Sequence, residues 1–138
     1  MEKDFPILSV DNPDWDTIGG GIHSYNIRKA GEDNGQNLCF MIQGPEEEAL
    51  GGVIAAVHWD WLYIDLMWIK EEFRGLGYGR RLLEMVEDKA RLLGAKNAYL
   101  DTFSFQAPGF YQKFGYQVFG ELKDFPVGFQ RFYLSKTL

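Results

Sequence analysis

A glycine-rich segment between an apolar run and an amphipathic pattern constrains the fold of this chain more than any other feature. The segment reads Arg74-Gly75-Leu76-Gly77-Tyr78-Gly79-Arg80-Arg81, and it follows an apolar run that ends at Ile69. Apolar residues then recur three and four positions apart over residues 79–93, which is the spacing of one helix face, and Gly94 follows as a helix stop. The segment therefore predicts a strand, a tight loop and a helix in succession.

This glycine loop, residues 74–79, has the properties of an anion-binding site. Alternate glycines let the backbone turn sharply and expose its N–H groups. The first turn of the following helix adds unpaired N–H groups and a partial positive charge, which together suit a pyrophosphate. Arg74, Arg80 and Arg81 add cations in a chain of net charge −6. The sequence thus predicts a diphosphate site at residues 76–81, with a plain glycine-rich turn as the alternative.

Two familiar nucleotide motifs fit this loop less well. No GxxxxGK[ST] pattern occurs, so a Walker loop is excluded. A dinucleotide fingerprint would use Gly75 and Gly77, with Asp101 as its acidic residue. Against it, the third glycine falls at position 79 rather than 80, and residues 70–74 separate the strand from the glycines. A dinucleotide-dependent oxidoreductase is therefore the less favoured alternative.

The rest of the chain predicts an α/β fold whose sheet of six or seven strands is mostly antiparallel, with a central β-α-β crossover and helices on both faces. Residues 37–69 are expected to form an antiparallel meander. A first helix is expected to begin at Asn12-Pro13, with a break, a kink or a close approach at Gly19-Gly20-Gly21. The other expected elements are strands at 5–10, 98–103, 116–122 and 129–135 and a short helix at 107–114.

Composition limits the class of protein. With 138 residues, 46% hydrophobic and 16% aromatic, the chain is expected to form a single domain over residues 1–138. The acidic net charge argues against nucleic-acid binding; it either attracts a cationic substrate or only keeps the protein soluble. There is no signal-peptide pattern and no run of about 18 apolar residues. We therefore expect a cytoplasmic protein with no membrane partner.

Cysteine and histidine offer little chemistry in this chain. Cys39 is the only cysteine and is expected to be a buried structural thiol. His23 and His58 lack the spacing of metal ligands, so no metal site is expected.

Two motifs in this order resemble those of one enzyme family. The first is Arg74-Gly75-Leu76-Gly77-Tyr78-Gly79, which fits the pattern [RQ]-x-x-G-x-[GA] between a strand and a helix. The second is Ala107-Pro108-Gly109-Phe110-Tyr111-Gln112-Lys113-Phe114-Gly115-Tyr116, which is similar to A-x-x-x-Y-x-K-x-G-[FY]. Together they resemble the GNAT superfamily of N-acetyltransferases, and the order of elements agrees over nearly the whole chain. The stretches DTFSFQAPGFYQKFGY and DFPVGFQRFYL further resemble small bacterial members of that family.

The resemblance implies how acetyl-CoA would be bound. The strand end before the glycine loop would pair with the pantetheine arm, and a bulge there would point an N–H group at the thioester oxygen. Ser104 stands where many members carry an asparagine that contacts the cofactor, so that contact is expected to be weaker or differently made here. The implied cofactor-binding residues are Met67, Trp68, Ile69, Arg74, Gly75, Leu76, Gly77, Tyr78, Gly79, Arg80, Ser104 and Tyr111.

The resemblance also implies catalytic and acceptor-binding roles. Tyr111 matches the tyrosine that protonates the leaving thiolate, although it is also a candidate core aromatic between Phe110 and Phe114. Asp65 is the candidate proton acceptor for the attacking amine, or else an ordinary strand residue. The acceptor site is expected to draw on Tyr25, Asn26, Asp101 and Phe125.

The function expected from this resemblance is transfer of an acetyl group from acetyl-CoA to a primary amine. The amine would attack directly in a ternary complex, and a small-molecule acceptor is favoured over a protein. A homodimer is possible because relatives form them. The alternative from another class is an acyl-CoA-binding module without turnover.

Overall fold

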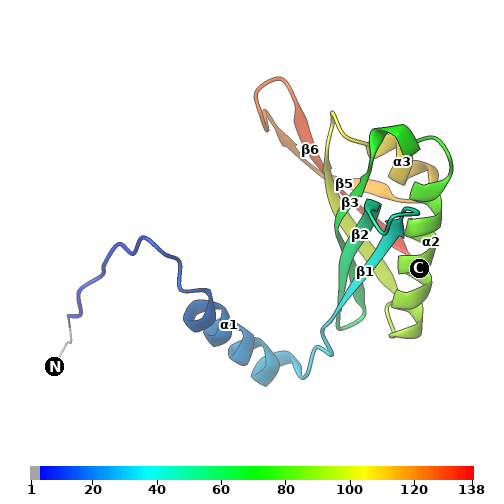
Figure 1. Ribbon diagram of the computed structural model, residues 1–138. Helices are drawn as coiled ribbons and strands as arrows, with labels where there is room; N and C mark the ends of the chain where they lie inside the picture. The colour runs from blue at the N-terminus through cyan, green and yellow to red at the C-terminus, as the bar shows by residue number, and fades with distance from the viewer. Residues whose placement is uncertain (1–3) are drawn as a thin grey trace. The chain divides into compact units, whose positions relative to one another are not determined.

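The computed structural model describes residues 4–138, and the chain divides into two compact units, residues up to Asp33 and residues from Asn34 onward. Each unit is described by itself (Figure 1). The first contains one helix, α1 (Trp15–Ala30). Asp14 is its N-cap and accepts a 3.0 Å hydrogen bond from the Thr17 N–H. Asp14 therefore begins the helix, and the predicted start at Asn12-Pro13 is wrong by two residues.

Two further features expected in the first unit, a strand at residues 5–10 and a break at the three glycines, are not observed. Residues 5–10 form no strand, and residues 4–14 pair with no strand in the described part of the chain. Apolar side chains alone do not make a strand, because the backbone also needs a ladder partner. Helix α1 continues through Gly19-Gly20-Gly21 without a break. Glycine weakens a helix but keeps its N–H group, so the hydrogen bonds of the helix are retained.

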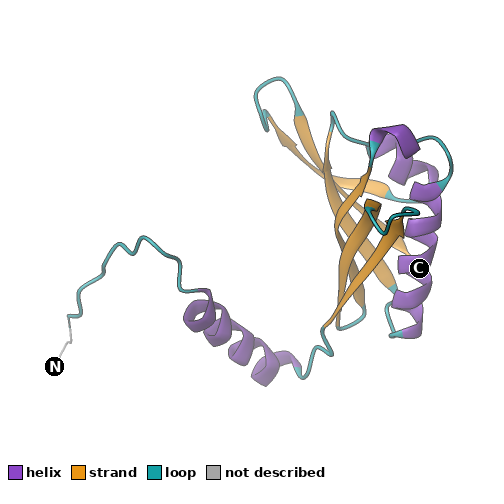
Figure 2. Cartoon of the chain, viewed as in Figure 1, coloured by secondary structure: helices purple, strands orange, loops and turns teal. Residues whose placement is uncertain are grey.

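The second unit is a six-stranded sheet with two α-helices (Figure 2). The strand order is β1-β2-β3-β4-β6-β5, and every neighbouring pair is antiparallel except β3 and β4. The predicted meander over residues 37–69 is confirmed. The strands are β1 (Gln36–Gln43), β2 (Ala49–His58), β3 (Trp61–Ile69), β4 (Asn97–Phe103), β5 (Gln117–Lys123) and β6 (Gln130–Thr137). The helices are the 3₁₀ turn η1 (Glu71–Phe73), α2 (Tyr78–Leu92) and α3 (Pro108–Lys113).

The core lies between the sheet and α2. Leu82, Leu83, Val86 and Ala90 recur on one face of α2 and are buried. They pack in one cluster with alternate residues of the strands, Leu38, Val53, Ala55, Val57, Leu62, Ile64, Ala98, Leu100 and Leu134. Burial of these side chains holds α2, and the glycine loop before it, against the end of β3.

Cys39 is exposed, so its prediction as a buried thiol is wrong. Successive side chains of a strand point to opposite faces. On β1, Leu38 points to the core beside α2, which leaves its neighbour Cys39 on the opposite face.

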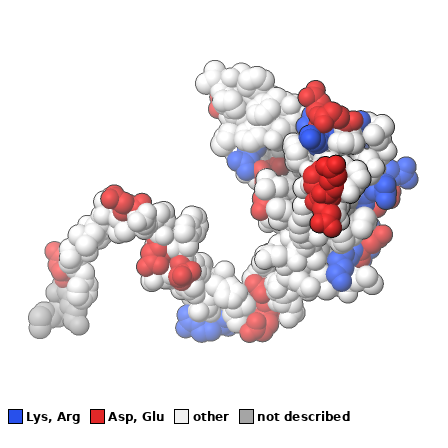
Figure 3. Space-filling view, in the orientation of Figure 1, with Lys and Arg blue, Asp and Glu red and all other residues white. Residues whose placement is uncertain are grey.

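The surface of the second unit carries charges of both signs. On the face drawn in Figure 3, Lys and Arg side chains form separate groups among Asp and Glu side chains rather than one continuous basic surface. Across residues 4–138, no helix has the length and apolar character needed to cross a membrane.

Candidate active site

The site begins where β3 and β4 separate. These strands pair in parallel only from Trp61↔Asn97 to Ile64↔Leu100. On the other edge of β3, Ile54 pairs with Leu66 and Ala55 with Ile64, so Asp65 is an extra residue in a β-bulge. Beyond the last pair the two strands no longer pair with each other, and Asp65 and Asp101 are the first residues past this fork.

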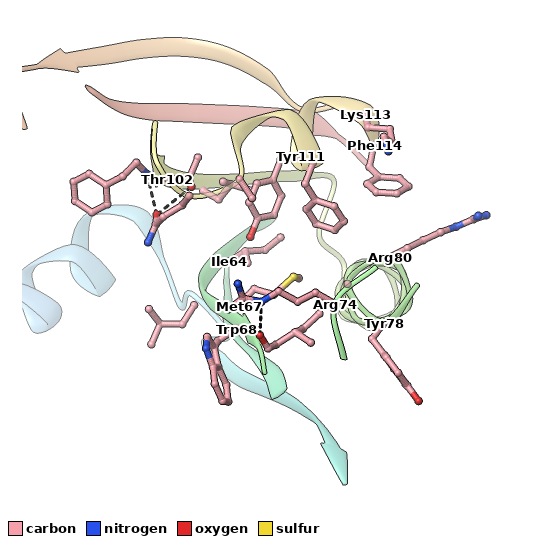
Figure 4. Close-up of a pocket in the computed structure, with 18 of the residues that line it drawn as sticks. Ile64, Met67, Trp68, Arg74, Tyr78, Arg80, Thr102, Tyr111, Lys113 and Phe114 are labelled. Atoms are coloured by element: carbon pink, nitrogen blue, oxygen red, sulfur yellow. Dashed lines mark hydrogen bonds between the residues drawn. The ribbon is translucent and has the colours of Figure 1, made fainter. Parts of the chain in front are cut away.

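A cavity of about 1040 Å³ opens at the fork (Figure 4). Its lining comes from β3, the glycine loop, the start of α2, β4, α3 and Arg131 of β6. It brings together most of the residues singled out from the sequence, namely Asp65, Met67, Trp68, Ile69, Arg74, Gly75, Gly77, Tyr78, Gly79, Arg80, Asp101 and Tyr111.

The glycines of the loop have different physical roles. Gly75 and Gly77 have φ of +74° and +89°, a backbone region that L side chains rarely adopt. Gly77 is also the N-cap of α2 and brings no side-chain hydrogen bond, so the first-turn N–H groups are left for a ligand. Gly79 is needed for close packing, because a Cβ there would lie 3.2 Å from the Phe110 ring.

Cationic side chains gather at the loop end of the cavity. Arg74 donates from Nε to the Ile69 carbonyl oxygen at 2.7 Å, which holds the loop against the end of β3. Arg80 extends outward from α2 in Figure 4 and pairs with Glu84 at 2.8 Å. Lys113 of α3 also lines the cavity. This end therefore suits an anionic ligand, whereas both carboxylates lie at the fork.

Tyr111 projects from α3 into the cavity, toward Ile64 and Met67 (Figure 4). The residue is 8% exposed, and burial raises its pKa to about 12. Its hydroxyl is therefore protonated at neutral pH. Within residues 4–138 this hydroxyl has no hydrogen-bond partner, so its proton is available to a ligand.

The two carboxylates at the fork differ in their partners. Asp101 accepts hydrogen bonds from Nε and Nη2 of Arg131 and, at 3.1 Å, from the Tyr63 hydroxyl. Burial and the negative charge of Asp101 raise the pKa of Tyr63 to about 12, so that hydroxyl stays a donor. Asp65 is exposed and makes no hydrogen bond or ion pair with another described residue. Asp101 is thus held by side chains of the protein while it lines the cavity, and its part in acceptor binding stays a prediction; Asp65 has no such partner among the described residues.

An aromatic cluster lies beside Asp101 and Arg131. Phe103 and Phe105 stack with ring centroids 5.2 Å apart, and Phe125 lies 5.5 Å from Phe103. Phe105 lines the cavity, whereas Phe125 contacts its wall from outside. The Arg131 guanidinium lies 5.3 Å from the ring centres of both Phe103 and Phe125. Phe125 is thus a supporting residue of the site rather than part of its lining.

Two other predicted site residues of the second unit, Ser104 and Leu76, do not line the cavity. The Ser104 hydroxyl accepts the Gln130 N–H at 3.0 Å, which ties the end of β4 to β6. Leu76 is exposed at the tip of the glycine loop. Tyr25 and Asn26 lie on α1, in the first unit, so their part in acceptor binding stays a prediction.

Sequence reasoning missed several lining residues, among them Tyr63, Gln106 and Arg131. The Gln106 side-chain oxygen accepts bonds from the Thr102 hydroxyl and the Phe103 N–H. Arg131 is 30 residues from Asp101, and no local pattern links them. The one available signal for Tyr63 was its position two residues before Asp65 on the same strand.

Comparison with known proteins agrees with this geometry. The sequence matches the family model described as the acetyltransferase (GNAT) family over residues 7–116. The chain belongs to the GNAT family of acetyltransferases. It is therefore an acyltransferase, and its six-stranded mixed sheet is the GNAT fold. This family membership sets aside the oxidoreductase alternative.

Relatives and solved structures support the assignment to GNAT. The blasticidin-S acetyltransferase of Streptomyces morookaense is 40% identical over 96 residues, which cover 69% of this chain and 71% of that protein. An acetyltransferase from Bacillus cereus matches with a TM-score of 0.84 and 30% identity, covering 95% of this chain and 98% of that chain. A GNAT acetyltransferase from Elizabethkingia anophelis, solved with acetyl-CoA bound, shares the fold at a TM-score of 0.61 and 21% identity, over 74% of this chain and 76% of that chain.

Proposed function

We propose that this GNAT enzyme transfers the acetyl group of acetyl-CoA to a primary amine of a small molecule. One observation carries the proposal: a single cavity joins the cationic glycine loop to Tyr111 and Asp65 at the fork. The blasticidin-S acetyltransferase among its relatives is named for a small-molecule acceptor, which favours a small amine over a protein here.

The cavity residues suit coenzyme A. The first-turn N–H groups after Gly77, with Arg74 and Lys113 nearby, would hold the diphosphate. Beyond Ile64, no strand of residues 4–138 pairs with β3 on its cavity side, so its main chain can pair with the pantetheine amides. The bulge at Asp65 reorients a main-chain N–H in this stretch. In comparable sites such a donor stabilises an oxyanion by about 3 kcal/mol.

The chemistry divides between two side chains. The amine nitrogen forms a bond to the acetyl carbon while the carbon–sulfur bond breaks. Tyr111 would donate its proton to the departing sulfur as general acid; burial raises its pKa to about 12, so it stays protonated to higher pH than an ordinary tyrosine. Asp65 would bind the incoming ammonium and accept its proton, directly or through water. Asp101, already held by Arg131 and Tyr63, would keep the wall of the acceptor end in place.

The acceptor end favours an amine that also carries apolar surface. Phe103 and Phe105 present stacked rings beside the cavity, and Phe129 packs edge-on against Phe105 at 5.2 Å. Asp65 supplies the negative charge that attracts the amine. We expect the acceptor to place its ammonium at the fork and its apolar part against these rings.

A panel of amines tests the proposal. The purified protein is mixed with acetyl-CoA and one amine at a time, including blasticidin S, a polyamine, an aminoglycoside, amino acids and a lysine peptide, and thiol release is followed. We expect release with at least one small amine and none without an amine. Acetyl-CoA binding without release from any amine would instead indicate a non-catalytic acyl-CoA-binding module, and a lack of binding would refute the cofactor assignment.

A further inference from the structure

A buried hydrogen-bond network joins α2 to Tyr116, three residues beyond the end of α3, and the proposed reaction does not use it directly. Tyr116 is 1% exposed, and its hydroxyl donates a 2.7 Å hydrogen bond to Oε2 of Glu87, which is 5% exposed. Lys136 of β6 donates from Nζ to both oxygens of Glu87, at 3.0 and 3.1 Å. Burial and the Glu87 charge raise the pKa of Tyr116, so its hydroxyl remains a donor.

A contribution to the free energy of folding does not by itself explain why these polar groups are buried. Taking a carboxylate out of water costs free energy that its partners only partly restore, and apolar residues of the same volume often stabilise a protein as well or better. Polar networks with every group satisfied do, however, fix the relative positions of the elements they join. The hydrogen bond between Tyr116 and Glu87 therefore fixes the relative positions of the elements that carry these residues.

Tyr116 is bound closely to Tyr111. Its N–H donates to the Tyr111 carbonyl oxygen at 3.1 Å, and the Gly115 N–H donates to the Gln112 carbonyl oxygen at 3.1 Å. With φ of +96° at Gly115, these bonds form the Schellman motif that ends α3. The rings of Tyr111 and Tyr116 lie edge to face with centroids 6.0 Å apart. A shift of the Tyr116 side chain therefore reaches the Tyr111 ring.

Glu87 lies on the helix that begins at the glycine loop. The bond from Tyr116 to Glu87 thus fixes the end of α3, which carries Tyr111, to α2, whose first turn faces the cavity. We propose that Tyr116 is a positioning residue: through its hydrogen bond to Glu87, it holds the Tyr111 hydroxyl at the reacting end of the cavity. The inference rests on the proposed function, in which Tyr111 is the general acid.

A double-mutant cycle tests this positioning role, using acetyl-CoA and the best acceptor of the amine panel. Tyr111→Phe is expected to lower kcat about 100-fold, the low end for loss of a general acid. Tyr116→Phe is expected to lower kcat about tenfold by misplacing that acid. The KM for acetyl-CoA should stay unchanged in both variants. In the Tyr111→Phe background, Tyr116→Phe should cause no further loss, because both changes act through one hydroxyl.

An additive result would overturn the proposal. If Tyr116→Phe lowers kcat about tenfold in the Tyr111→Phe background as well, its effect does not pass through Tyr111. Tyr99→Phe is the matched control, because the Tyr99 hydroxyl makes no hydrogen bond with another described residue and Tyr99 does not line the cavity. That variant should keep the wild-type kcat.

Amide hydrogen exchange tests the tether without any acceptor. Tyr116→Phe should speed exchange of the main-chain N–H groups of Gly115 and Tyr116, which close the end of α3. Tyr99→Phe should leave their rates unchanged. Equal rates in Tyr116→Phe and wild type would overturn the tether. If every amine fails in the panel, the proposed function fails, while the exchange experiment still decides whether Glu87 and Tyr116 hold α3.

Discussion

Gly77 allows a quantitative prediction about the glycine loop. Its φ is +89°, and a Cβ added there would meet no atom within 4 Å. Gly77→Ala therefore adds backbone strain without a steric clash, so the variant is expected to fold. For an L residue, the left-handed region costs about 1–2 kcal/mol.

That strain must appear in one of two measurements. If alanine keeps the loop geometry, the free energy of unfolding falls by about 1–2 kcal/mol, and Tm falls by roughly 3–6 °C for a chain of this size. If the loop relaxes instead, its N–H groups leave the phosphate site, and binding of acetyl-CoA has to restore them. The Kd then rises about tenfold, since each 1.4 kcal/mol is a factor of ten.

Thermal unfolding and calorimetric titration with acetyl-CoA measure the two effects on the same sample. Gly109→Ala is the control, because Gly109 lies inside α3, outside the left-handed region and with no atom within 4 Å of an added Cβ. Alanine is expected to stabilise that position by up to about 1 kcal/mol. A Gly77→Ala variant with wild-type Tm and wild-type Kd would refute the strain argument.

Three further predictions follow from contacts in the second unit. Burial raises the pKa of Tyr111 to about 12, so Tyr111 keeps its proton below that pH. A pH profile of kcat should therefore show no alkaline fall caused by Tyr111 up to about pH 10. A fall near neutral pH that Tyr111→Phe abolishes would contradict this. The negative charge of Asp101 helps to raise the pKa of Tyr63, and Asp101→Asn removes that charge. A spectrophotometric titration of the variant should therefore find the pKa of Tyr63 below its wild-type value of about 12. An unchanged pKa would mean that Asp101 does not contribute to it. Gly51→Ala would place a Cβ 2.6 Å from the Trp68 carbonyl oxygen. The free energy of unfolding measured in urea should therefore fall by about 1–3 kcal/mol. A variant with wild-type stability would show that β2 and β3 can shift locally to make room for the methyl group.

Local sequence patterns were sufficient to predict the part of the fold that carries the glycine loop. The helical spacing after Gly79 and the stop at Gly94 predicted α2, which ends at Leu92 with Gly94 at φ +94°. The glycine loop, the meander and the short helix α3 were likewise predicted, because each depends on residues close together in the chain.

The errors came from features that depend on distant partners or on competing local effects. Residues 5–10 have strand-like composition, but pairing decides whether a strand forms, and composition does not contain that information. The glycines of α1 lower its helix propensity, yet Asp14 caps the helix and the helix continues. Cys39 has the usual chemistry of a core residue, and only its phase relative to Leu38 places it on the exposed face.

The site shows the same division. The glycine loop was predicted from a local motif, and the roles of Tyr111 and of the strand end were predicted from the family resemblance; all three line the cavity. The Asp101–Arg131 pair joins residues 30 positions apart, and the Glu87–Tyr116 bond joins residues 29 apart. The first pair depends on the register of β4 with β6, and the second depends on the packing of α2. No pattern in a single sequence determines either one.

The fork between β3 and β4 affects how this enzyme can change during evolution. Past Ile64 and Leu100, the facing edges of the two strands offer peptide groups with no strand partner among the described residues. A side-chain substitution cannot delete a peptide group, so recognition built on this edge persists while neighbouring side chains drift. The end of the cavity that we propose for the acceptor, in contrast, is lined by side chains such as Asp65, Phe103 and Phe105. Under the proposed function, a point mutation at the acceptor end would therefore change the amine specificity and leave binding of the acyl donor intact.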